Sequence, residues 1–254
     1  MTARVELLAL DGIPEIRPGD DLGAIIAGAL RDADIGLRED DVLVVTQKVV
    51  SKAEGRVVDL ASVSPSPPAA EFAERWGKDP RQVELVLRES AEVLRMADGG
   101  LIISRTRQGF VCANAGVDLS NVGGGEVATL LPVDPDASAR RLAEGLWELA
   151  GVRVPVVISD SFGRPWRNGI VNVAIGVAGL APLLDLRGRP DAQGRLMRST
   201  VIAVADELAS AAELAGGKTD QRPVVVVRGY TTENVKNGPG AAALVMDRAH
   251  DLFP

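Results

Sequence analysis

Aromatic residues are scarce in this 254-residue chain, at 3% of the total. The core must therefore be built from Val, Leu, Ile and Ala, and no platform of rings is present on which single-stranded nucleic acid could stack. Basic residues are also in deficit, because 28 Lys and Arg face 35 Asp and Glu and give a net charge of −7. We therefore expect no nucleic-acid partner. An anionic ligand would have to be met locally by a few Lys and Arg, together with a divalent cation.

Cysteine and histidine occur once each, as Cys112 and His250. A single cysteine excludes an internal disulfide and a cysteine-based zinc site. His250 stands near the end of the sequence, so a Ser–His–Asp triad built on Ser159 or Ser161 would require the tail to fold back onto the core. We therefore expect no serine nucleophile.

Long apolar runs and the common phosphate-binding motifs are missing too. The most apolar late window, residues 170–184, is interrupted by Asn172 and several glycines, so we expect no membrane span. The first residues, MTARVELLAL, lack the pattern of a secretory signal, and we expect a cytoplasmic protein. Neither G-x-x-x-x-G-K-[ST] nor G-x-G-x-x-G occurs, which excludes the usual phosphate and dinucleotide loops.

The patterns that are present alternate loosely between strand and helix. Short apolar runs predict strands at residues 5–8, 42–45, 101–103, 110–113, 154–158 and 224–228. Helical spacing or small-residue composition predicts helices at 22–30, 80–96, 137–150, 200–214 and 239–249. For the helix 137–150 we expect Asp134 or Asp136 as the cap and Leu142, Leu146 and Leu149 as buried residues. The prolines of SVSPSPPAAEF predict an irregular surface loop. Without an internal repeat or a regular βα rhythm, the fold class is α/β or mixed α+β, in one large domain or two small ones.

Polar residues gather in four stretches that adjoin predicted strands. They are Gln47, Lys48 and Lys52; Asp118 and Asn121; Asp160, Ser161, Arg164 and Arg167; and Lys218 in the loop GGKTDQRP. Each has an ordinary structural reading, since paired lysines are usually solvated and an aspartate in a glycine-rich loop often forms an Asx turn. From the residues alone both readings stay open.

The stretch VISDSFGRPWRNG, residues 157–169, is the most informative. Asp160 and Ser161 follow an apolar strand and form a hard-oxygen pair of the kind that Mg²⁺ and Mn²⁺ prefer. A turn or N-cap aspartate is the alternative. Arg164 and Arg167 weaken that alternative, because two positive charges beside a metal site call for an anion. The residues therefore favour hard-metal, polyphosphate chemistry on an uncommon scaffold.

Nine segments follow one another in a distinctive order. They are GIPEIRPGDDL, VLVVTQKVVSKAEGR, VLRESAEVLR, VCANAGVDLSNV, LLPVDPDASA, VVISDSFGRPWRNG, AIGVAGL, VADELA and VVVVRG. In order and approximate spacing, from about Val5 to Tyr230, they resemble the coenzyme F420-0:γ-glutamyl ligase family. The resemblance implies a mixed α/β fold in an intertwined homodimer. It also implies one family domain over residues 1–254, divisible into two subdomains, without the C-terminal nitroreductase-like domain of some members.

The same resemblance implies an activity. The family uses GTP to join L-glutamate to the deazaflavin precursor F420-0, first at its lactyl carboxylate and then through γ-linkages, with an acyl phosphate as the expected intermediate. Mg²⁺ or Mn²⁺, two per site, is the implied metal, and K⁺ is a further candidate cation. The alternatives are a non-catalytic subunit that binds GTP or deazaflavin, and a ligase of this scaffold with another acid acceptor.

Residue roles carry over by position. Asp118, Asp160 and Ser161 match metal ligands and, with Lys52, the catalytic set. The positions that match nucleotide contacts are Ile13, Pro14, Glu15, Ile16, Gln47, Lys52, Asn121, Ala215, Gly216, Gly217, Lys218, Thr219, Asp220, Gln221 and Arg222.

The chain departs from the family pattern at three places. Ser161 stands where Thr is common, which keeps the hydroxyl oxygen. Gln47 replaces a small hydroxyl residue, which weakens that assignment. Gly217 and Lys218 occupy the place where some members supply an acid to the second metal, so that site would depend on Ser161, phosphate and water. We expect Arg164 or Arg167 to meet a phosphate or a substrate carboxylate, and Trp166 has no predicted role.

Overall fold

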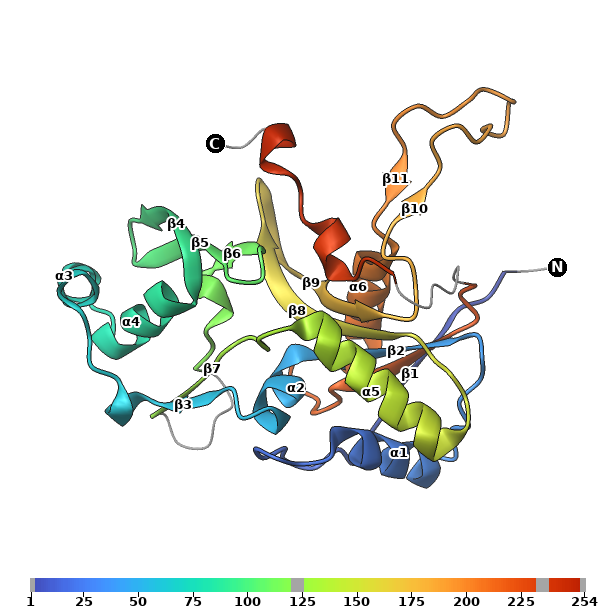
Figure 1. Ribbon diagram of the computed structural model, residues 1–254, viewed down its shortest axis with the longest axis horizontal. Helices are drawn as coiled ribbons and strands as arrows, with labels where there is room; N and C mark the ends of the chain where they lie inside the picture. The colour runs from blue at the N-terminus through green and yellow to red at the C-terminus, as the bar shows by residue number, and fades with distance from the viewer. Residues whose placement is uncertain (1–2, 120–125, 232–237, 252–254) are drawn as a thin grey trace.

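The computed structural model describes residues 3–119, 126–231 and 238–251. A five-stranded sheet in the order β1-β12-β2-β8-β9 forms its centre (Figure 1). These strands are β1 (Glu6–Ala9), β12 (Val224–Arg228), β2 (Asp41–Thr46), β8 (Val156–Arg164) and β9 (Arg167–Ala178). Strands β2 and β8 run parallel, whereas the other neighbouring pairs are antiparallel.

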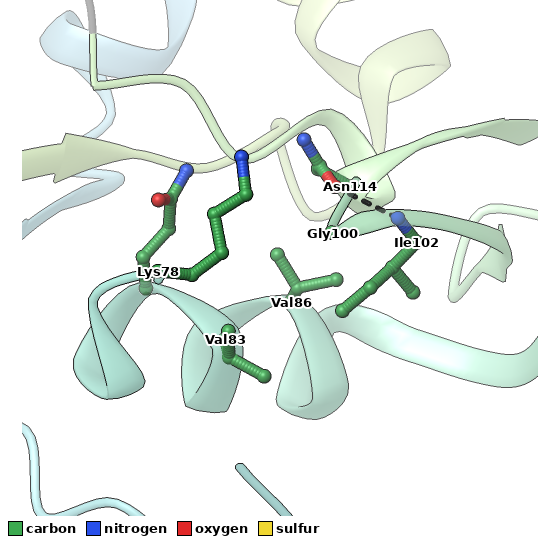
Figure 2. A pocket seen from close by; sticks show the side chains of 7 residues that line it. Lys78, Val83, Val86, Gly100, Ile102 and Asn114 are labelled. Atoms are coloured by element: carbon green, nitrogen blue, oxygen red, sulfur yellow. Dashed lines mark hydrogen bonds between the residues drawn. The ribbon is translucent and has the colours of Figure 1, made fainter. Parts of the chain in front are cut away.

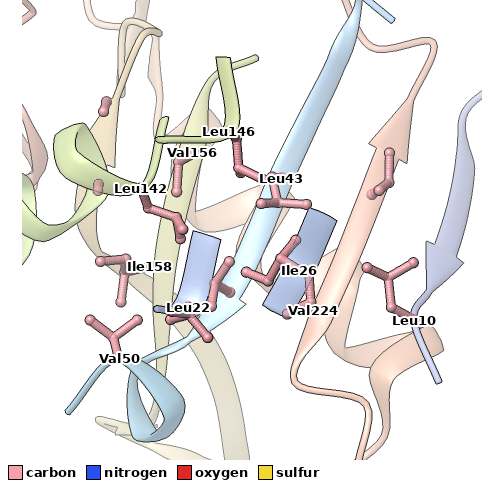
Figure 3. Packing of buried hydrophobic residues seen from close by; sticks show 14 of the residues in the cluster. Leu10, Leu22, Ile26, Leu43, Val50, Leu142, Leu146, Val156, Ile158 and Val224 are labelled. Atoms are coloured by element: carbon pink, nitrogen blue, oxygen red, sulfur yellow. The ribbon is translucent and has the colours of Figure 1, made fainter. Parts of the chain in front are cut away.

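Helices cover both faces of this sheet. On one face lie α1 (Leu22–Asp32), α2 (Gln47–Ala53) and α5 (Pro135–Ala150), and on the other lies α6 (Val204–Gly216). Leu43 and Val45 of β2 pack with the first group, and Val42 and Val44 pack with α6. Figure 3 shows Leu43 among side chains of the first face. Burial on both faces explains why the strand is a continuous apolar run.

A second cluster of buried residues lies beside the sheet, on the left of Figure 1. Its elements are β3 (Val57–Asp59), α3 (Pro67–Trp76), α4 (Pro80–Glu89), β4 (Ser90–Ala97), β5 (Leu101–Thr106), β6 (Val111–Ala113) and β7 (Val127–Thr129). Strands β4, β5 and β6 form one small sheet, and β3 pairs with β7 in another. The segment that carries Asp118 runs beside β7, where Asp118 forms a β-bridge with Thr129.

Two hairpins project from the body (Figure 1). The first is the outer half of β8 and β9. The second joins β10 (Leu184–Asp185) to β11 (Val201–Ile202). Short 3₁₀ turns complete the described chain: Leu60–Ser62, Asn114–Gly116, Ala241–Leu244 and Arg248–His250. Among the described residues, no helix is long and apolar enough to cross a membrane.

The predicted α/β class and the predicted strands are confirmed, but several boundaries are wrong. The proline-rich stretch was expected to stay irregular, yet α3 begins at Pro67. Proline is well suited to the first turn of a helix, because its missing N–H would have no partner there. In this stretch the prolines mark the start of a helix and do not exclude regular structure.

The expected helix over residues 80–96 is wrong in its second half. Helix α4 ends at Glu89, and Ser90–Ala97 pairs with β5 as strand β4. Leu94 is 44% exposed there, so its helical spacing did not reflect a buried helical face. Cross-strand pairing overrides local propensity in this segment.

Three further expectations need correction. The helix predicted to start at residue 200 starts at Val204, because Val201–Ile202 pairs with β10. The last helix, expected over 239–249, is replaced by two short 3₁₀ turns. Leu149 was expected in the core, but it is 53% exposed at the end of α5. Helix α5 itself begins at Pro135, two residues before the expected start at 137, and Asp134, one of the two expected caps, is its N-cap.

Candidate active site

One edge of the central sheet gathers three segments that are far apart in the sequence. Strand β2 ends at Thr46, which lies opposite Ser159 of the parallel strand β8, and β8 continues past this edge to Arg164. Strand β12 is antiparallel to β2, so Val224 lies opposite Val45 and the loop before β12 reaches this edge too. The carboxyl ends of parallel strands are a common place for ligand sites. Helix α2, the residues after Ser159 and loop 215–222 therefore converge.

The two predicted metal-binding aspartates lie near each other at this edge. Burial raises the pKa of Asp160 to about 6, and the charge of Asp118 acts in the same direction. The Ser161 amide, Lys218 and Lys48 oppose that rise, the amide through a 2.8 Å hydrogen bond to Asp160 Oδ1. A half-buried carboxylate beside a second carboxylate is poised to hold a cation.

Two lysines flank the aspartates. Lys48 Nζ lies 2.7 Å from Asp118 Oδ2, and Lys218 Nζ donates to Ser161 Oγ at 2.8 Å. Lys218 was among the predicted nucleotide contacts. Lys48 stands with Gln47 and Lys52 in a polar stretch beside a predicted strand, but it was not among the predicted nucleotide contacts or metal ligands.

A buried polar chain lies behind Ser161. Its hydroxyl donates to Asn172 Oδ1 at 2.8 Å, and Asn172 Nδ2 donates to Glu213 Oε2 at 2.8 Å. Asn172 is opposite Ser161 in the β8–β9 pair and is 5% exposed. Neither Asn172 nor Glu213 was predicted. The signal for Asn172 was an amide within an otherwise apolar strand.

A small pocket adjoins this polar chain. Its lining includes Thr46, Ser159, Asn172, Glu213 and Arg222. Ser159 is 1% exposed, and its hydroxyl has no hydrogen-bond partner. The remaining lining residues are apolar or glycine, so the interior side of the site combines polar and apolar groups.

The predicted nucleotide segment of residues 13–16 lies against helix α2. Lys52 Nζ is 2.5 Å from Glu15 Oε1, and Lys52 is almost fully buried. Ile16 packs into the core, whereas Pro14 is exposed. Gln47 is 4% exposed, and its side-chain oxygen accepts from Ser51 Oγ at 2.7 Å. The structure thus turns Gln47 toward the interior and brings Lys52 to the segment.

Loop 215–222 joins helix α6 to strand β12. Gly217 has φ +67°, and a Cβ there would collide with the carboxylate of Asp220, so this turn favours glycine. Residues 218–221 are exposed. Arg222 Nε lies 2.7 Å from Asp11 Oδ1, which ties the loop to the start of the 13–16 segment. The two predicted nucleotide segments therefore lie on the same side of the molecule.

Two predicted positions, Arg164 and Arg167, are not brought to the aspartates. A third predicted position, Asn121, lies outside the described residues. Arg164 and Arg167 pair with each other near the tip of the β8–β9 hairpin, three residues or about 10 Å beyond Ser161 along the strand. Trp166 is at that tip with 81% exposure. The side chains of Arg164, Trp166 and Arg167 therefore stand on the projecting part of the hairpin.

Cys112 lies close enough to the site for its thiol to interact with the Asp160 charge. Burial raises the pKa of Cys112 to about 12, and Asp160 acts in the same direction. The thiol therefore stays protonated at neutral pH and is a poor nucleophile.

A separate hollow lies between α4 and β5 (Figure 2). Its lining residues are Lys78, Gln82, Val83, Val86, Gly100, Ile102 and Asn114. The Ile102 amide donates to Asn114 Oδ1 at 3.3 Å. This hollow contains none of the predicted site residues.

The oxygen atoms at the sheet edge suit a hard divalent cation. Asp118 and Asp160 supply carboxylates and Ser161 a hydroxyl. Within the described ranges no group of three or more His, Cys, Asp or Glu could hold a metal ion. Further ligands would therefore have to come from phosphate oxygens or water, as is common for Mg²⁺.

Comparisons with known proteins give a consistent result. A family model described as F420-0:Gamma-glutamyl ligase matches residues 12–229. Relatives named Coenzyme F420:L-glutamate ligase include those of Methanothermobacter thermautotrophicus, 45% identical over 250 residues (98% of each chain), and Methanopyrus kandleri, 46% identical over 255 residues (99% of this chain and 98% of the relative). A third, from Methanocaldococcus jannaschii, is 39% identical over 254 residues (98% and 97%).

Proposed function

The chain belongs to the F420-0:gamma-glutamyl ligase family, and from this membership we propose that it joins L-glutamate to the coenzyme precursor F420-0, with GTP as co-substrate. The observation that carries the proposal is the sheet edge, where the half-buried Asp160 lies near Asp118 and the pair is flanked by Lys48 and Lys218. In this proposal the first glutamate is attached to the lactyl carboxylate, and further ones are attached through γ-linkages.

The reaction needs an activated carboxylate, because a free carboxylate is a poor electrophile. In the proposed route a carboxylate oxygen of F420-0 attacks the γ-phosphorus of GTP, and the bond to the β-phosphate oxygen breaks to release GDP. The glutamate amine then attacks the acyl carbon, phosphate leaves, and the nitrogen loses a proton. Phosphoryl transfer of this kind depends on alignment and charge neutralisation rather than on a protein nucleophile. The lack of a histidine or reactive cysteine at the site agrees with that requirement.

Asp118 and Asp160 would hold the first divalent cation, Mg²⁺ or Mn²⁺, and Ser161 would offer its hydroxyl oxygen to a second. When bound, the cation supplies positive charge to the phosphate oxygens during transfer. A second cation would depend on Ser161, phosphate and water, because Gly217 and Lys218 bring no carboxylate.

The lysines of the site would act on the nucleotide. Lys48 lies on the first turn of α2 and Lys218 on an exposed loop. Their ammonium groups contact Asp118 and Ser161, so both lie at the same edge of the sheet. Once the cation binds the two aspartates, the lysine ammonium groups would bind phosphate oxygens of the nucleotide. The Lys52–Glu15 ion pair would keep the 13–16 segment against α2 as the wall of the nucleotide site.

A homodimer in the cytoplasm is part of the proposal. The two projecting hairpins carry exposed apolar side chains, among them Ile170 at 57% and Leu196 at 65%. Exposed apolar groups on projecting arms favour contact with another chain. They support the intertwined dimer expected from the family.

The proposed site is tested by Asp160→Ala. We expect GTP-dependent glutamylation of F420-0 to fall by more than about 100-fold, because the buried oxygen ligand is lost. Asp98→Ala, an exposed aspartate in the turn between β4 and β5, is the matched control and should retain full activity. Near-normal turnover by a folded Asp160→Ala protein would contradict the site assignment.

The chemical route has its own test. F420-0 labelled with ¹⁸O in its lactyl carboxylate should deliver ¹⁸O into the released phosphate. Unlabelled phosphate together with glutamylated product would contradict the acyl-phosphate route and leave the ligase activity standing.

A further inference from the structure

Ser161 is hydrogen-bonded to Asn172, which is hydrogen-bonded in turn to Glu213. The proposed mechanism gives neither Asn172 nor Glu213 a role. The Ser161 hydroxyl donates to Asn172 Oδ1, and Asn172 Nδ2 donates to Glu213 Oε2, each at 2.8 Å. The three residues come from β8, β9 and α6. Asn172, the middle member of this chain, is 5% exposed, and Ser161 and Glu213 at its two ends are half-buried.

The chemistry of the three groups fixes the direction of every hydrogen bond. Glu213 Oε2 accepts from Asn172 Nδ2, so Asn172 turns its NH₂ group toward Glu213. The amide oxygen of Asn172 then faces Ser161, and this oxygen also only accepts. The Ser161 proton must therefore point at Asn172.

The outer side of Ser161 Oγ is consequently an acceptor. It already accepts from Lys218 Nζ at 2.8 Å, which shows that a positive charge fits there. A hydroxyl that binds a hard cation must likewise direct an oxygen lone pair toward the cation and point its proton away from it. The buried chain imposes that orientation before any ligand arrives.

Two structural features keep the chain in place. Ser161 and Asn172 are direct cross-strand partners, so their side chains are neighbours on one face of the hairpin. Glu213 lies in the last turn of α6, whose end leads directly into the loop that carries Lys218. The Ser210 hydroxyl also donates to the backbone oxygen of Asn172 at 2.7 Å.

We propose that Asn172 and Glu213 are positioning residues, which orient the Ser161 hydroxyl so that its lone pairs face the cation site. This inference rests on the proposed function, in which Ser161 is a metal ligand. The competing explanation is that the chain only satisfies buried polar groups and contributes to stability. Outer hydrogen-bond partners of metal ligands commonly change metal affinity by about 10- to 100-fold, which separates the two explanations.

The test measures metal binding without turnover. Mn²⁺ is titrated into the full-length protein with GTP present and with glutamate and F420-0 omitted, and free Mn²⁺ is followed by electron paramagnetic resonance. Glu213→Ala releases the Asn172 amide, and the nearly isosteric Asn172→Leu removes the acceptor for the Ser161 proton. Both variants should weaken Mn²⁺ binding by about 10-fold or more.

Two further variants are controls. Glu213→Gln keeps an oxygen that can accept from Asn172 Nδ2, so binding should stay within about threefold of the wild type. Ser210→Ala removes a hydrogen bond from α6 to the Asn172 backbone and leaves the amide orientation unchanged, so binding should be unaltered. Thermal unfolding of each variant confirms that the binding curves compare folded proteins.

The outcomes separate the two proposals. Wild-type affinity in both Glu213→Ala and Asn172→Leu would overturn the positioning role and leave the metal site intact. An equal loss in Ser210→Ala would also overturn it, because the effect would then reflect helix packing. If the wild type itself binds no Mn²⁺ beyond that held by GTP alone, the proposed metal site fails and the positioning role fails with it.

Discussion

At the scale of single residues, Asp160 shows how the site trades stability for function. Its carboxyl has a pKa of about 6, above the ordinary 3.8, because burial disfavours the charged form. The folded protein therefore binds a proton more tightly than the unfolded chain between about pH 4 and pH 6. Stability from this group is greatest below pH 4, falls as the pH rises to 6, and stays low above it.

Asp160→Asn should consequently stabilise the metal-free protein at neutral pH. A rise of the Asp160 pKa from 3.8 to about 6 corresponds to roughly 3 kcal/mol of unfolding free energy above pH 6, as an upper bound. We expect a gain of about 1–3 kcal/mol at pH 8 and almost none at pH 4. Urea unfolding in EDTA at the two pH values measures it, and an equal effect at both would refute the burial argument.

The sequence allowed some site residues to be predicted, but the contacts between them could not be. Asp160 and Ser161 were recognisable because they follow a buried strand directly. Asp118 gained its role only from the family resemblance. Asn172 and Glu213 stand 41 positions apart, and only the pairing of β8 with β9 and the packing of α6 bring them to Ser161. No local spacing encodes such contacts.

At the scale of elements, a strand could be predicted from the sequence when its burial alone determines its residue pattern. Strands β2 and β12 are buried on both faces, so their runs of Val and Leu could be read directly. Strand β4 lies at the edge of its small sheet with mostly exposed side chains. Its sequence therefore carried no alternation, and only the pairing with β5 defines it.

The contact between α5 and β9 makes an element-scale prediction. A Cβ at Gly176 would collide with the backbone of Pro135, in the first turn of α5. Gly176→Ala should therefore force the helix from the sheet and cost about 1–3 kcal/mol of unfolding free energy in urea. Gly163→Ala, on the same hairpin with nothing within 4 Å of its Cβ, is the matched control and should change little. Equal effects of the two substitutions would contradict the close approach.

At the scale of the whole molecule, charge is distributed unevenly. The chain is acidic overall at −7, yet Lys48 and Lys52 of helix α2 and Lys218 of the loop after α6 lie at one edge of the sheet. A general positive surface is not needed when a few cations meet the nucleotide locally. The same argument explains why the acidic composition argues against a nucleic-acid partner but is compatible with a polyphosphate ligand.

The projecting hairpins make a prediction at this scale. The wild type should have twice the chain mass in solution by light scattering, because exposed apolar residues on the arms call for a partner surface. Leu196→Asp at the arm beyond β10, or Ile170→Asp on β9, should shift it toward the monomer. Glu144→Gln on helix α5 changes charge elsewhere and should leave the mass unchanged. A monomeric wild type at micromolar concentration would contradict the dimer.

The most direct test of the central claim is the mass of the product. Purified protein is incubated with F420-0, L-glutamate, GTP and Mg²⁺ or Mn²⁺, and the deazaflavin is analysed by mass spectrometry alongside GDP. We predict that F420-0 gains the mass of one or more glutamyl residues, with one GDP formed for each residue added. Unchanged F420-0 in the presence of folded protein and all substrates would contradict the proposed ligase activity.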